Sequence, residues 1–278
     1  MKLNDELFEI GKNSIGTCKI IDNDYVLVTK KMPVSDELLE DYVNSIREAK
    51  EDGINICKIE DYKLLPETTS HFNNGTSFSK GVFIEERAKG NSLNFEPFYI
   101  NEEDKIEIVK NYMNSIDFYI GEIEKRSEAD EEVYNKLVSD VLSLSKYGLE
   151  IDPKPLNFFF NEKTGYTIID VIPITKLGKN EFIPQYIKSI VFGYGIPHLY
   201  LENNDISMMP KPLYDRYNNA KKVLCAKIEM AMLRHDFKEN DFKVFDTLKN
   251  EKDPVIVDYV DLHDYVDDKI DEHKGYKI

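Results

Sequence analysis

What the chain lacks narrows the kinds of protein that it can be. Its 278 residues include only three cysteines, Cys18, Cys57 and Cys225, which are far apart and odd in number. None belongs to a Cys-x-x-Cys motif or a Cys/His cluster, so the sequence offers no zinc site. We therefore expect a chain that works in a reducing compartment.

Long apolar runs are also missing. No stretch approaches the roughly 20 apolar residues that a membrane-spanning helix needs. Residues 1–6 carry Lys2, Asp5 and Glu6 at the place where a signal peptide has its apolar core. We therefore expect a cytoplasmic protein with no membrane partner.

Positive charge is in deficit. The chain has 36 Lys and Arg residues against 52 Asp and Glu residues, a net charge of -16. Binding to phosphate backbones or anionic lipid needs a basic surface, so we expect no nucleic-acid partner. A hydrophobic content of 41% argues against a disordered chain. The length suffices for one large domain or two lobes.

One segment carries a candidate catalytic centre. Asp152 and Asn157 are five residues apart, and Asp170 follows thirteen residues after Asn157. Two apolar stretches, 158–160 and 166–169, surround a turn and predict a β-hairpin that brings Asn157 and Asp170 to the same end. An Asp that accepts a hydroxyl proton, with an Asn and an Asp that share Mg²⁺, is what phosphoryl transfer from ATP requires.

One segment resembles the catalytic loop of the protein kinase superfamily and is closest to that of Ser/Thr protein kinases: Asp152-Pro153-Lys154-Pro155-Leu156-Asn157. The resemblance implies an α+β, bilobal protein kinase-like fold. It places a small antiparallel sheet and one helix in an N-lobe, residues 1–87, and a mainly helical C-lobe in residues 88–278. The absence of repeats and of Gly/Ser linkers agrees with a single bilobal unit.

The same resemblance implies a role for each residue of the segment, with ATP and Mg²⁺ as ligands. Asp152 would orient or deprotonate the acceptor hydroxyl, and Lys154 would steady the γ-phosphate. Asn157 and Asp170 would hold Mg²⁺.

Residues 7–20 resemble the glycine-rich turn that covers the phosphates in kinases. Gly11 and Gly16 match the first and third glycines of the Gly-x-Gly-x-x-Gly pattern, and Asn13 stands at the second. Apolar residues on both sides predict a strand, a turn and a second strand.

Residues 25–30 are rich in β-branched side chains and predict a strand. A lysine at its end resembles the kinase lysine that binds the ATP phosphates. Alternation puts Lys30 on the same face as Val28, which would line the adenine pocket, and puts Lys31 on the other face. We therefore choose Lys30.

A helix is expected over residues 35–50, because apolar residues recur there at steps of three and four. Its place matches the kinase helix whose glutamate pairs with the strand lysine. Glu40, beside the apolar stripe, is the preferred partner of Lys30, with Glu37 and Glu48 as alternatives.

Residues 81–86 predict another apolar strand, which leads into acidic residues and a glycine. This resembles the kinase hinge, where main-chain groups near Glu86 and Ala88 would hydrogen-bond adenine. Further helices are expected near 101–120, 129–147, 181–193 and 212–235. The last has Tyr217, Val223, Met230 and Leu233 among its expected buried residues.

The match with kinases has departures. Glu150 and Ile151 stand where the family has His-Arg, Val171 and Ile172 replace Phe-Gly after Asp170, and no Ala-Pro-Glu follows. Without that Arg we expect no switch by a phosphorylated activation loop.

Three functions stay open. The first is a kinase that moves the γ-phosphoryl group of ATP to a protein Ser/Thr hydroxyl, which Lys154 favours. The second is a small-molecule kinase of the aminoglycoside or choline phosphotransferase type, favoured by the divergent C-terminal half. The third is a non-catalytic pseudokinase that binds partners.

Overall fold

The computed structural model describes residues 1–13, 18–65, 70–71, 77–174, 183–250, 254–258 and 262–275. Its architecture mixes helices with several small sheets, as the α+β expectation has it. Contacts group the chain into unit 1, Met1–Asn91 with Lys136–Ile183, and unit 2, Ser92–Asn135 with Pro184–Ile278. This grouping differs from a division at residue 87, because it joins the segment around Asp152 to the N-terminal sheet. The division into kinase lobes stays a prediction.

An antiparallel sheet forms the first half of unit 1. Its main path is β1 (Cys18–Ile20), β2 (Tyr25–Met32), β5 (Ser77–Glu86) and β3 (Ile59–Leu64), and β4 (Ser70–His71) also pairs with β5. The strands expected over 25–30 and 81–86 are therefore confirmed. The register of β2 and β5 sets Val28 opposite Phe83 and Lys30 opposite Gly81.

The first element is a helix, so the strand expected at residues 7–10 is wrong. Helix α1 (Asp5–Lys12) begins after Asn4, whose side chain accepts a hydrogen bond from the Leu7 N–H. Phe8 packs with Leu27, Val82 and Ile84 of the sheet. The N-cap and the acidic first turn favour a helix at this point.

Gly11 explains how the helix fits, because it lies inside α1 and not in a turn. A Cβ atom added there would lie 2.4 Å from a methyl carbon of Val82. Its carbonyl accepts a hydrogen bond from the Thr29 hydroxyl at 2.8 Å. The glycine therefore permits close packing of the helix on the sheet.

The helix expected over 35–50 is confirmed as α2 (Leu39–Glu51), which follows a 3-10 turn at Asp36–Leu38. Its buried residues are spaced by three and four positions, as the sequence pattern indicated: Leu39, Tyr42, Val43, Ile46 and Ala49. This face anchors α2 in unit 1.

The expected hairpin is also confirmed. Strands β8 (Phe158–Asn161) and β9 (Gly165–Ile168) are antiparallel, and β7 (Leu149–Ile151) pairs with β10 (Val171–Pro173) beside them. The Cys57 N–H donates to the Ile168 carbonyl at 2.8 Å, and the Ile168 N–H donates to the Asn55 carbonyl at 2.9 Å. Main-chain bonds thus tie the hairpin to the segment that leads into β3.

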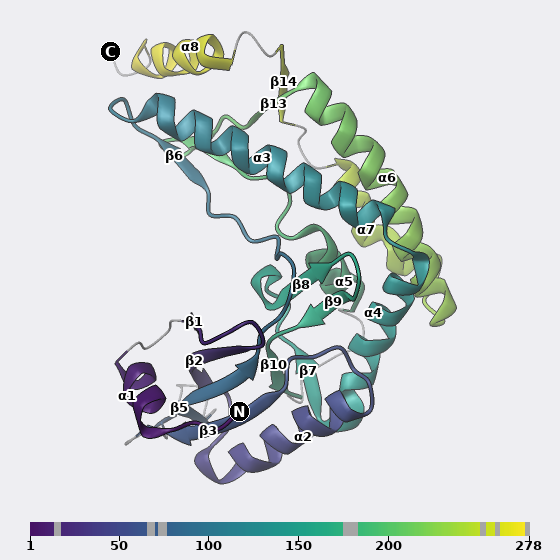
Figure 1. Cartoon of the computed structure of the whole chain (residues 1–278). Coiled ribbons are helices and arrows are strands. Elements are labelled where there is room, and N and C mark those ends of the chain that lie inside the picture. The colour runs from purple at the N-terminus through teal and green to yellow at the C-terminus, as the bar shows by residue number, and fades with distance from the viewer. Residues whose placement is uncertain are drawn as a thin grey trace. The chain divides into compact units, whose positions relative to one another are not determined.

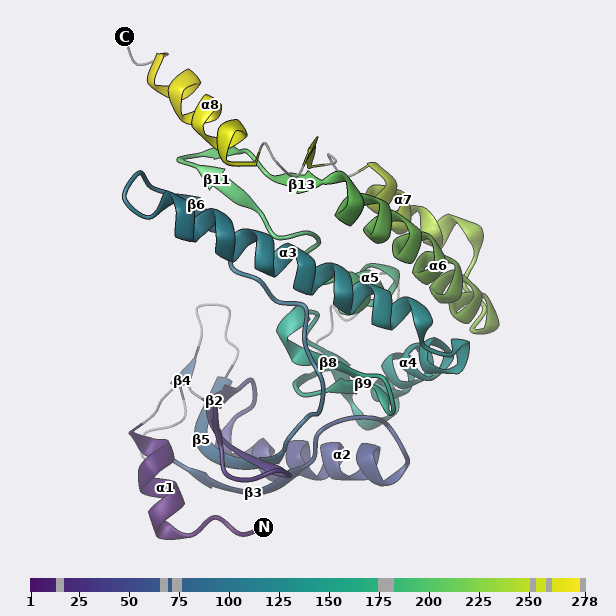
Figure 2. The same cartoon turned by 45° about the horizontal axis from the view of Figure 1, so that its top comes forward.

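Unit 2 is built around α3 (Lys105–Glu128) and α6 (Lys211–Arg234), which run side by side in Figures 1 and 2. Arg216 of α6 joins them through Asp117 at 3.0 Å and Glu124 at 2.6 Å. The other elements with residues in this unit are β6 (Phe98–Ile100), α4 (Glu131–Ser143), α5 (Ile183–Phe192), β11 (Leu199–Leu201), β12 (Asn204–Asp205), β13 (Met208–Pro210), α7 (Lys243–Asn250), β14 (Val255–Val257) and α8 (Leu262–Gly275). Helices α4 and α5 cross the boundary between the units.

The four helices expected in the second half are present. In α6, Tyr217 is buried as expected, but the rest of the buried face differs from the expected one. Val223, Met230 and Leu233 are about half exposed, at 47%, 49% and 46%. Leu224 and Ile228, at a spacing of four, are fully buried instead. Apolar side chains of α6 itself occur on all sides of the helix, so its sequence does not single out one buried face.

A helix with the length and apolar character needed to span a membrane is not found among the described residues.

Gly90 is a position where only glycine fits, which gives a first prediction. Its φ is +96°, and an added Cβ would lie 1.8 Å from the Phe160 carbonyl oxygen. Gly90→Ala should lower the free energy of unfolding by about 2 kcal/mol or more, measured by urea denaturation.

The control is Gly121→Ala, because a Cβ at this position in α3 meets no atom within 4 Å. That change should leave stability unchanged or raise it by up to about 1 kcal/mol. Equal effects of the two substitutions would contradict the close approach of Gly90 to Phe160.

Candidate functional site

A cavity of about 420 Å³ lies within unit 1. Its volume is in the range of small-molecule sites, about 300–1,000 Å³. Strands β1 and β2, the end of β5 and the loops beside the β8–β9 hairpin line it with the following residues: Cys18, Ile20, Val26, Val28, Lys30, Glu85, Glu86, Arg87, Ala88, Gly90, Leu156, Asn157, Phe159, Ile169 and Asp170.

Strand alternation explains which residues of β2 reach the cavity. Val26, Val28 and Lys30 line it, while Leu27 and Thr29 contact α1 on the other face of the sheet. Lys31 is exposed, with its ammonium 4.9 Å from the centre of the Phe78 ring. The choice of Lys30 over Lys31 as the cavity lysine therefore agrees with the geometry.

Two carboxylates flank the Lys30 ammonium. Its Nζ atom lies 2.6 Å from Glu85 Oε1 and 3.6 Å from Asp170 Oδ1. The Glu85 side chain is only 7% exposed and that of Lys30 only 18%. The cluster therefore joins β2, β5 and the residue pair that follows β9.

The pKa values follow from this burial and charge. Burial disfavours the charged ammonium of Lys30, but Glu85 and Asp170 outweigh it and raise the pKa above its ordinary value. Burial raises the pKa of Glu85, and the nearby Lys30 charge partly offsets this rise. Lys30 therefore remains charged at neutral pH.

The expectation that Glu40 pairs with Lys30 was wrong. Glu40 is exposed on α2, and the alternatives, Glu48 of the same helix and Glu37 of the 3-10 turn before it, are exposed as well. The physical reason is that Glu85 already lies within 2.6 Å of Lys30 on the neighbouring strand. A buried carboxylate in an otherwise apolar strand needs such a charged partner.

Asn157 and Asp170 are brought together at the cavity, as the hairpin prediction implied. Asn157 is buried, and its carbonyl accepts a hydrogen bond from the Ile169 N–H at 2.9 Å. Its side-chain amide donates to the Asp152 carbonyl oxygen at 3.2 Å. Asn157 thus links the residue pair Ile169–Asp170 to the loop that carries Asp152.

Asp152 and Lys154 lie on this loop but are not among the residues that line the cavity. Lys154 Nζ donates to Asp152 Oδ2 at 2.6 Å, and the Asp152 side chain is 18% exposed. In this arrangement the lysine neutralises Asp152. The proposed roles of both residues in phosphoryl transfer stay predictions.

The oxygen donors at the cavity fit a magnesium ion. Mg²⁺ is usually bound by one or two carboxylates together with water and substrate phosphates, not by a complete protein cage. Asp170 and Asn157 line the cavity and provide a carboxylate and an amide. Within the described residues no cluster of three or more His, Cys, Asp and Glu side chains is placed to hold a metal. Any bound Mg²⁺ would therefore take its other ligands from water and phosphate.

The last residue of β5, Glu86, and the next two residues, Arg87 and Ala88, also line the cavity. The Glu86 N–H is already used, since it donates to the Lys58 carbonyl at 3.0 Å. In the part of the chain that the structure describes, the peptide groups of Ala88 form no hydrogen bond. Ala88 is thus the better of the two for main-chain contact with a base.

The described part of the expected glycine-rich turn, Gly11 to Asn13, belongs to the end of α1 and not to a turn between strands. Gly11 lies in α1 on the opposite face of the sheet from Lys30, and the Asn13 side chain donates to the Glu9 carbonyl at 2.8 Å. Gly16 falls outside the described residues. Cys18 and Ile20 of β1 line this side of the cavity instead.

Glu85 is the main site residue that sequence reasoning missed. The signal was present, because a carboxylate directly follows the apolar residues 82–84 in a predicted strand. The register that sets Glu85 opposite Val26 puts it on the same face of the sheet as Val28 and Lys30. The sequence alone does not give the register of β2 and β5, so it does not show that Glu85 and Lys30 share the cavity face.

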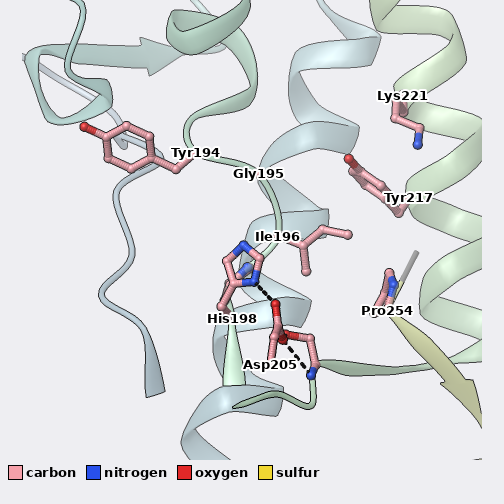
Figure 3. Close-up of a pocket in the computed structure, with 10 residues that line it drawn as sticks. Tyr194, Gly195, Ile196, His198, Asp205, Tyr217, Lys221 and Pro254 are labelled. Carbon is pink, nitrogen blue, oxygen red and sulfur yellow. Dashed lines mark hydrogen bonds and ion pairs between the residues drawn. The ribbon is translucent and has the colours of Figure 1, made fainter. Parts of the chain in front are cut away.

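A second cavity of about 170 Å³, with both polar and apolar lining residues, lies in unit 2 (Figure 3). His198 Nδ1 lies 2.8 Å from Asp205 Oδ2, and the Ser207 N–H donates to Asp205 Oδ1 at 2.9 Å. Burial would raise the pKa of Asp205, but the hydrogen bonds from Ser207 and His198 lower it below its usual value. The Ser207 hydroxyl also donates to Asp205 and not to His198. The arrangement therefore lacks the nucleophile–base contact of a hydrolase.

Comparisons with known proteins give little support for any family. No protein-family model matches the chain, and no curated protein matches it by sequence. One similar solved structure is that of the Toxoplasma gondii specific rhoptry antigen kinase domain, at 8% identity and a TM-score of 0.33. The similarity covers 83% of this chain and 76% of that one. At this TM-score it does not decide the fold or the activity.

The Lys30 cluster predicts a pH-dependent effect on stability. Lys30→Met leaves Glu85 buried without its cation, which should cost about 3–5 kcal/mol at pH 8. Burial holds the folded-state pKa of Glu85 above its unfolded value, so the carboxyl protonates as pH falls and the cost shrinks. Urea denaturation at pH 8 and pH 5 should therefore show a smaller loss at pH 5.

The matched control is Lys31→Met, because the Lys31 side chain is exposed and lies on the other face of the same strand. This change should alter stability by less than about 0.5 kcal/mol at either pH. A loss for Lys30→Met that is the same at both pH values would contradict the buried ion pair.

Proposed function

We propose that unit 1 is an ATP- and Mg²⁺-dependent phosphotransferase that moves the γ-phosphoryl group to a hydroxyl. The observation that supports this most is the composition of one cavity. A charged lysine, a carboxylate and an amide, Lys30, Asp170 and Asn157, line a cavity that also has an apolar wall from Val26 and Val28. An apolar wall suits a planar base, and the polar end suits phosphates with Mg²⁺.

Each side chain has a task in this proposal. The Lys30 ammonium neutralises phosphate oxygens, and Asp170 and Asn157 hold the magnesium ion. A bound Mg²⁺ would neutralise the charge that develops on the phosphates. Val26, Val28, Cys18 and Ile20 flank the base, and the main chain at Ala88 meets its edge.

Asp152 is the proposed acceptor-side group. It lies on the loop that Asn157 ties to the cavity, and it carries the carboxylate that would orient the acceptor hydroxyl or take its proton. Lys154 bonds to Asp152 in the structure, at 2.6 Å. We infer that this lysine turns to the γ-phosphate when nucleotide binds.

The acceptor is proposed to be a protein Ser/Thr hydroxyl, on the strength of the Lys154 position in the sequence. A small-molecule hydroxyl is the alternative acceptor, and a pseudokinase that only binds nucleotide or partners is the alternative to catalysis. Nucleotide binding and phosphoryl transfer, measured separately, distinguish the three.

Nucleotide binding is the first test. ATP with Mg²⁺ at 100 times its dissociation constant should stabilise the protein by about 2.7 kcal/mol. Asp170→Asn keeps the shape of the side chain but removes its charge, so the stabilisation that depends on Mg²⁺ should be lost. Thermal denaturation with ATP and either Mg²⁺ or a chelator measures both effects.

The control for binding is Asp152→Asn, which should keep the full shift because Asp152 does not line the cavity. Absence of any shift in the wild-type protein would remove the nucleotide-binding proposal. A shift that Asp170→Asn retains in full would remove the assigned metal role.

Phosphoryl transfer is the second test. With labelled ATP and Mg²⁺, Asp152→Asn should lower the turnover number by about 10²–10⁴-fold while nucleotide binding persists. A generic basic protein, amino alcohols and aminoglycosides serve as parallel acceptors. Labelling of protein hydroxyls supports the first acceptor class, and turnover only with small molecules supports the second. Binding without transfer to any acceptor would indicate a pseudokinase.

A further inference from the structure

The carboxylate that holds Lys30 comes from an unexpected element. We propose that Glu85 of β5 is the positioning residue of Lys30, and that α2 acts on the other side of the site by supporting Asp170 through Tyr42. This inference rests on the proposed function of Lys30 as the phosphate-binding lysine. It implies that a contact within the sheet fixes the position of the Lys30 ammonium, so that α2 need not move to place it.

Sheet geometry carries the first half of the inference. Lys30 lies opposite Gly81 and Glu85 lies opposite Val26, so both side chains are on the cavity face of adjacent strands. Gly81 has no side chain to block the Lys30 stem, and the ammonium lies 5.8 Å from the centre of the Phe83 ring. The Lys30 side chain thus extends past the Phe83 ring, and its Nζ atom lies 2.6 Å from Glu85 Oε1.

Burial makes it costly for the Lys30 ammonium and the Glu85 carboxylate to separate. Glu85 is 6% exposed as a residue, and an isolated carboxylate at such a site is costly. A buried pair loses several kcal/mol when one partner is removed. The ammonium is therefore held at one position, as a preorganised phosphate-binding site requires.

The two basic residues of α2 are engaged away from the Lys30 cluster. Arg47 donates to the carbonyls of Ile59 and Glu60 at 2.9 and 2.8 Å, and Lys50 pairs with Glu86 at 2.8 Å. These contacts hold the helix to β3 and to the end of β5. The glutamates of this segment, Glu37, Glu40 and Glu48, are exposed and do not reach Lys30.

Tyr42 gives α2 a different task. Its hydroxyl donates to the carbonyl of Val171, the residue directly after Asp170, and its side chain is buried. Burial raises the pKa of this hydroxyl well above its usual value, with further rises from Asp170 and Glu85. It therefore stays a hydrogen-bond donor at any physiological pH and secures the start of β10.

The test measures the lysine directly, without relying on catalysis. Acetic anhydride acetylates only the uncharged amine, so the pH dependence of labelling reports the pKa of each lysine. Mass spectrometry then separates Lys30 from Lys31 in the same peptide. In the wild-type protein, the Lys30 midpoint should lie above the ordinary pKa of a lysine side chain, which needs no variant to observe.

Glu85→Gln keeps the size of the side chain and removes its charge. The Lys30 midpoint should then fall, and its labelling rate at pH 9 should rise by about tenfold for each pH unit of the fall. Glu40→Gln is the matched control and should leave the Lys30 midpoint unchanged. A shift with Glu40→Gln, or none with Glu85→Gln, would overturn the assignment of Glu85.

The role of α2 is tested with Tyr42→Phe. This change should weaken the Mg²⁺-dependent part of ATP binding, because it loosens the strand that follows Asp170, and should leave the Lys30 midpoint in place. A change in the Lys30 midpoint with Tyr42→Phe would show that α2 positions the lysine after all, and would overturn the division of roles.

ATP with Mg²⁺ separates this inference from the proposed function. Protection of Lys30, but not of Lys31, from acetylation supports nucleotide binding at the cavity. If ATP gives no protection while Glu85→Gln still shifts the Lys30 midpoint, the proposed function fails and the Lys30–Glu85 pairing stands. If ATP protects Lys30 while Glu85→Gln leaves the midpoint unshifted, nucleotide binding stands and the positioning role of Glu85 fails.

Discussion

The buried contact between Lys30 and Glu85 is the interaction on which the candidate site depends. It joins two neighbouring strands on the cavity face of the sheet, and Asp170 adds a second carboxylate from the hairpin side. A charge cluster that is largely shielded from water keeps its geometry, because a buried charge that is separated from its partner destabilises the folded protein. The polar end of the cavity is therefore built from parts that hold one another in place.

The two faces of the sheet have different tasks, and this division organises unit 1. Helix α1 packs on the face that carries Leu27, Val82 and Ile84, while the other face lines the cavity. The main-chain bonds of Ile168 with Asn55 and Cys57 tie the hairpin to the same unit. All of the described residues that line the cavity thus belong to unit 1.

The local elements around the site were predictable, and the errors had specific causes. The hairpin after Asn157, the strand over residues 25–30 and the helix over residues 35–50 were predicted from alternation and from apolar spacing. Gly11 was misread because a glycine at a turn and a glycine at a close helix–sheet contact look alike in a sequence. For α6, apolar residues on every side hid the true buried face.

The sequence by itself determined the periodic features: which side chains share a face of a strand and which residues form the hairpin. Only the tertiary structure decided which carboxylate meets Lys30. Glu37, Glu40, Glu48 and Glu85 are all candidates in a linear sequence, because a charge pair between distant residues leaves no periodic signal. The antiparallel register of β2 and β5 selects Glu85, since it alone brings a buried carboxylate within 2.6 Å of the ammonium.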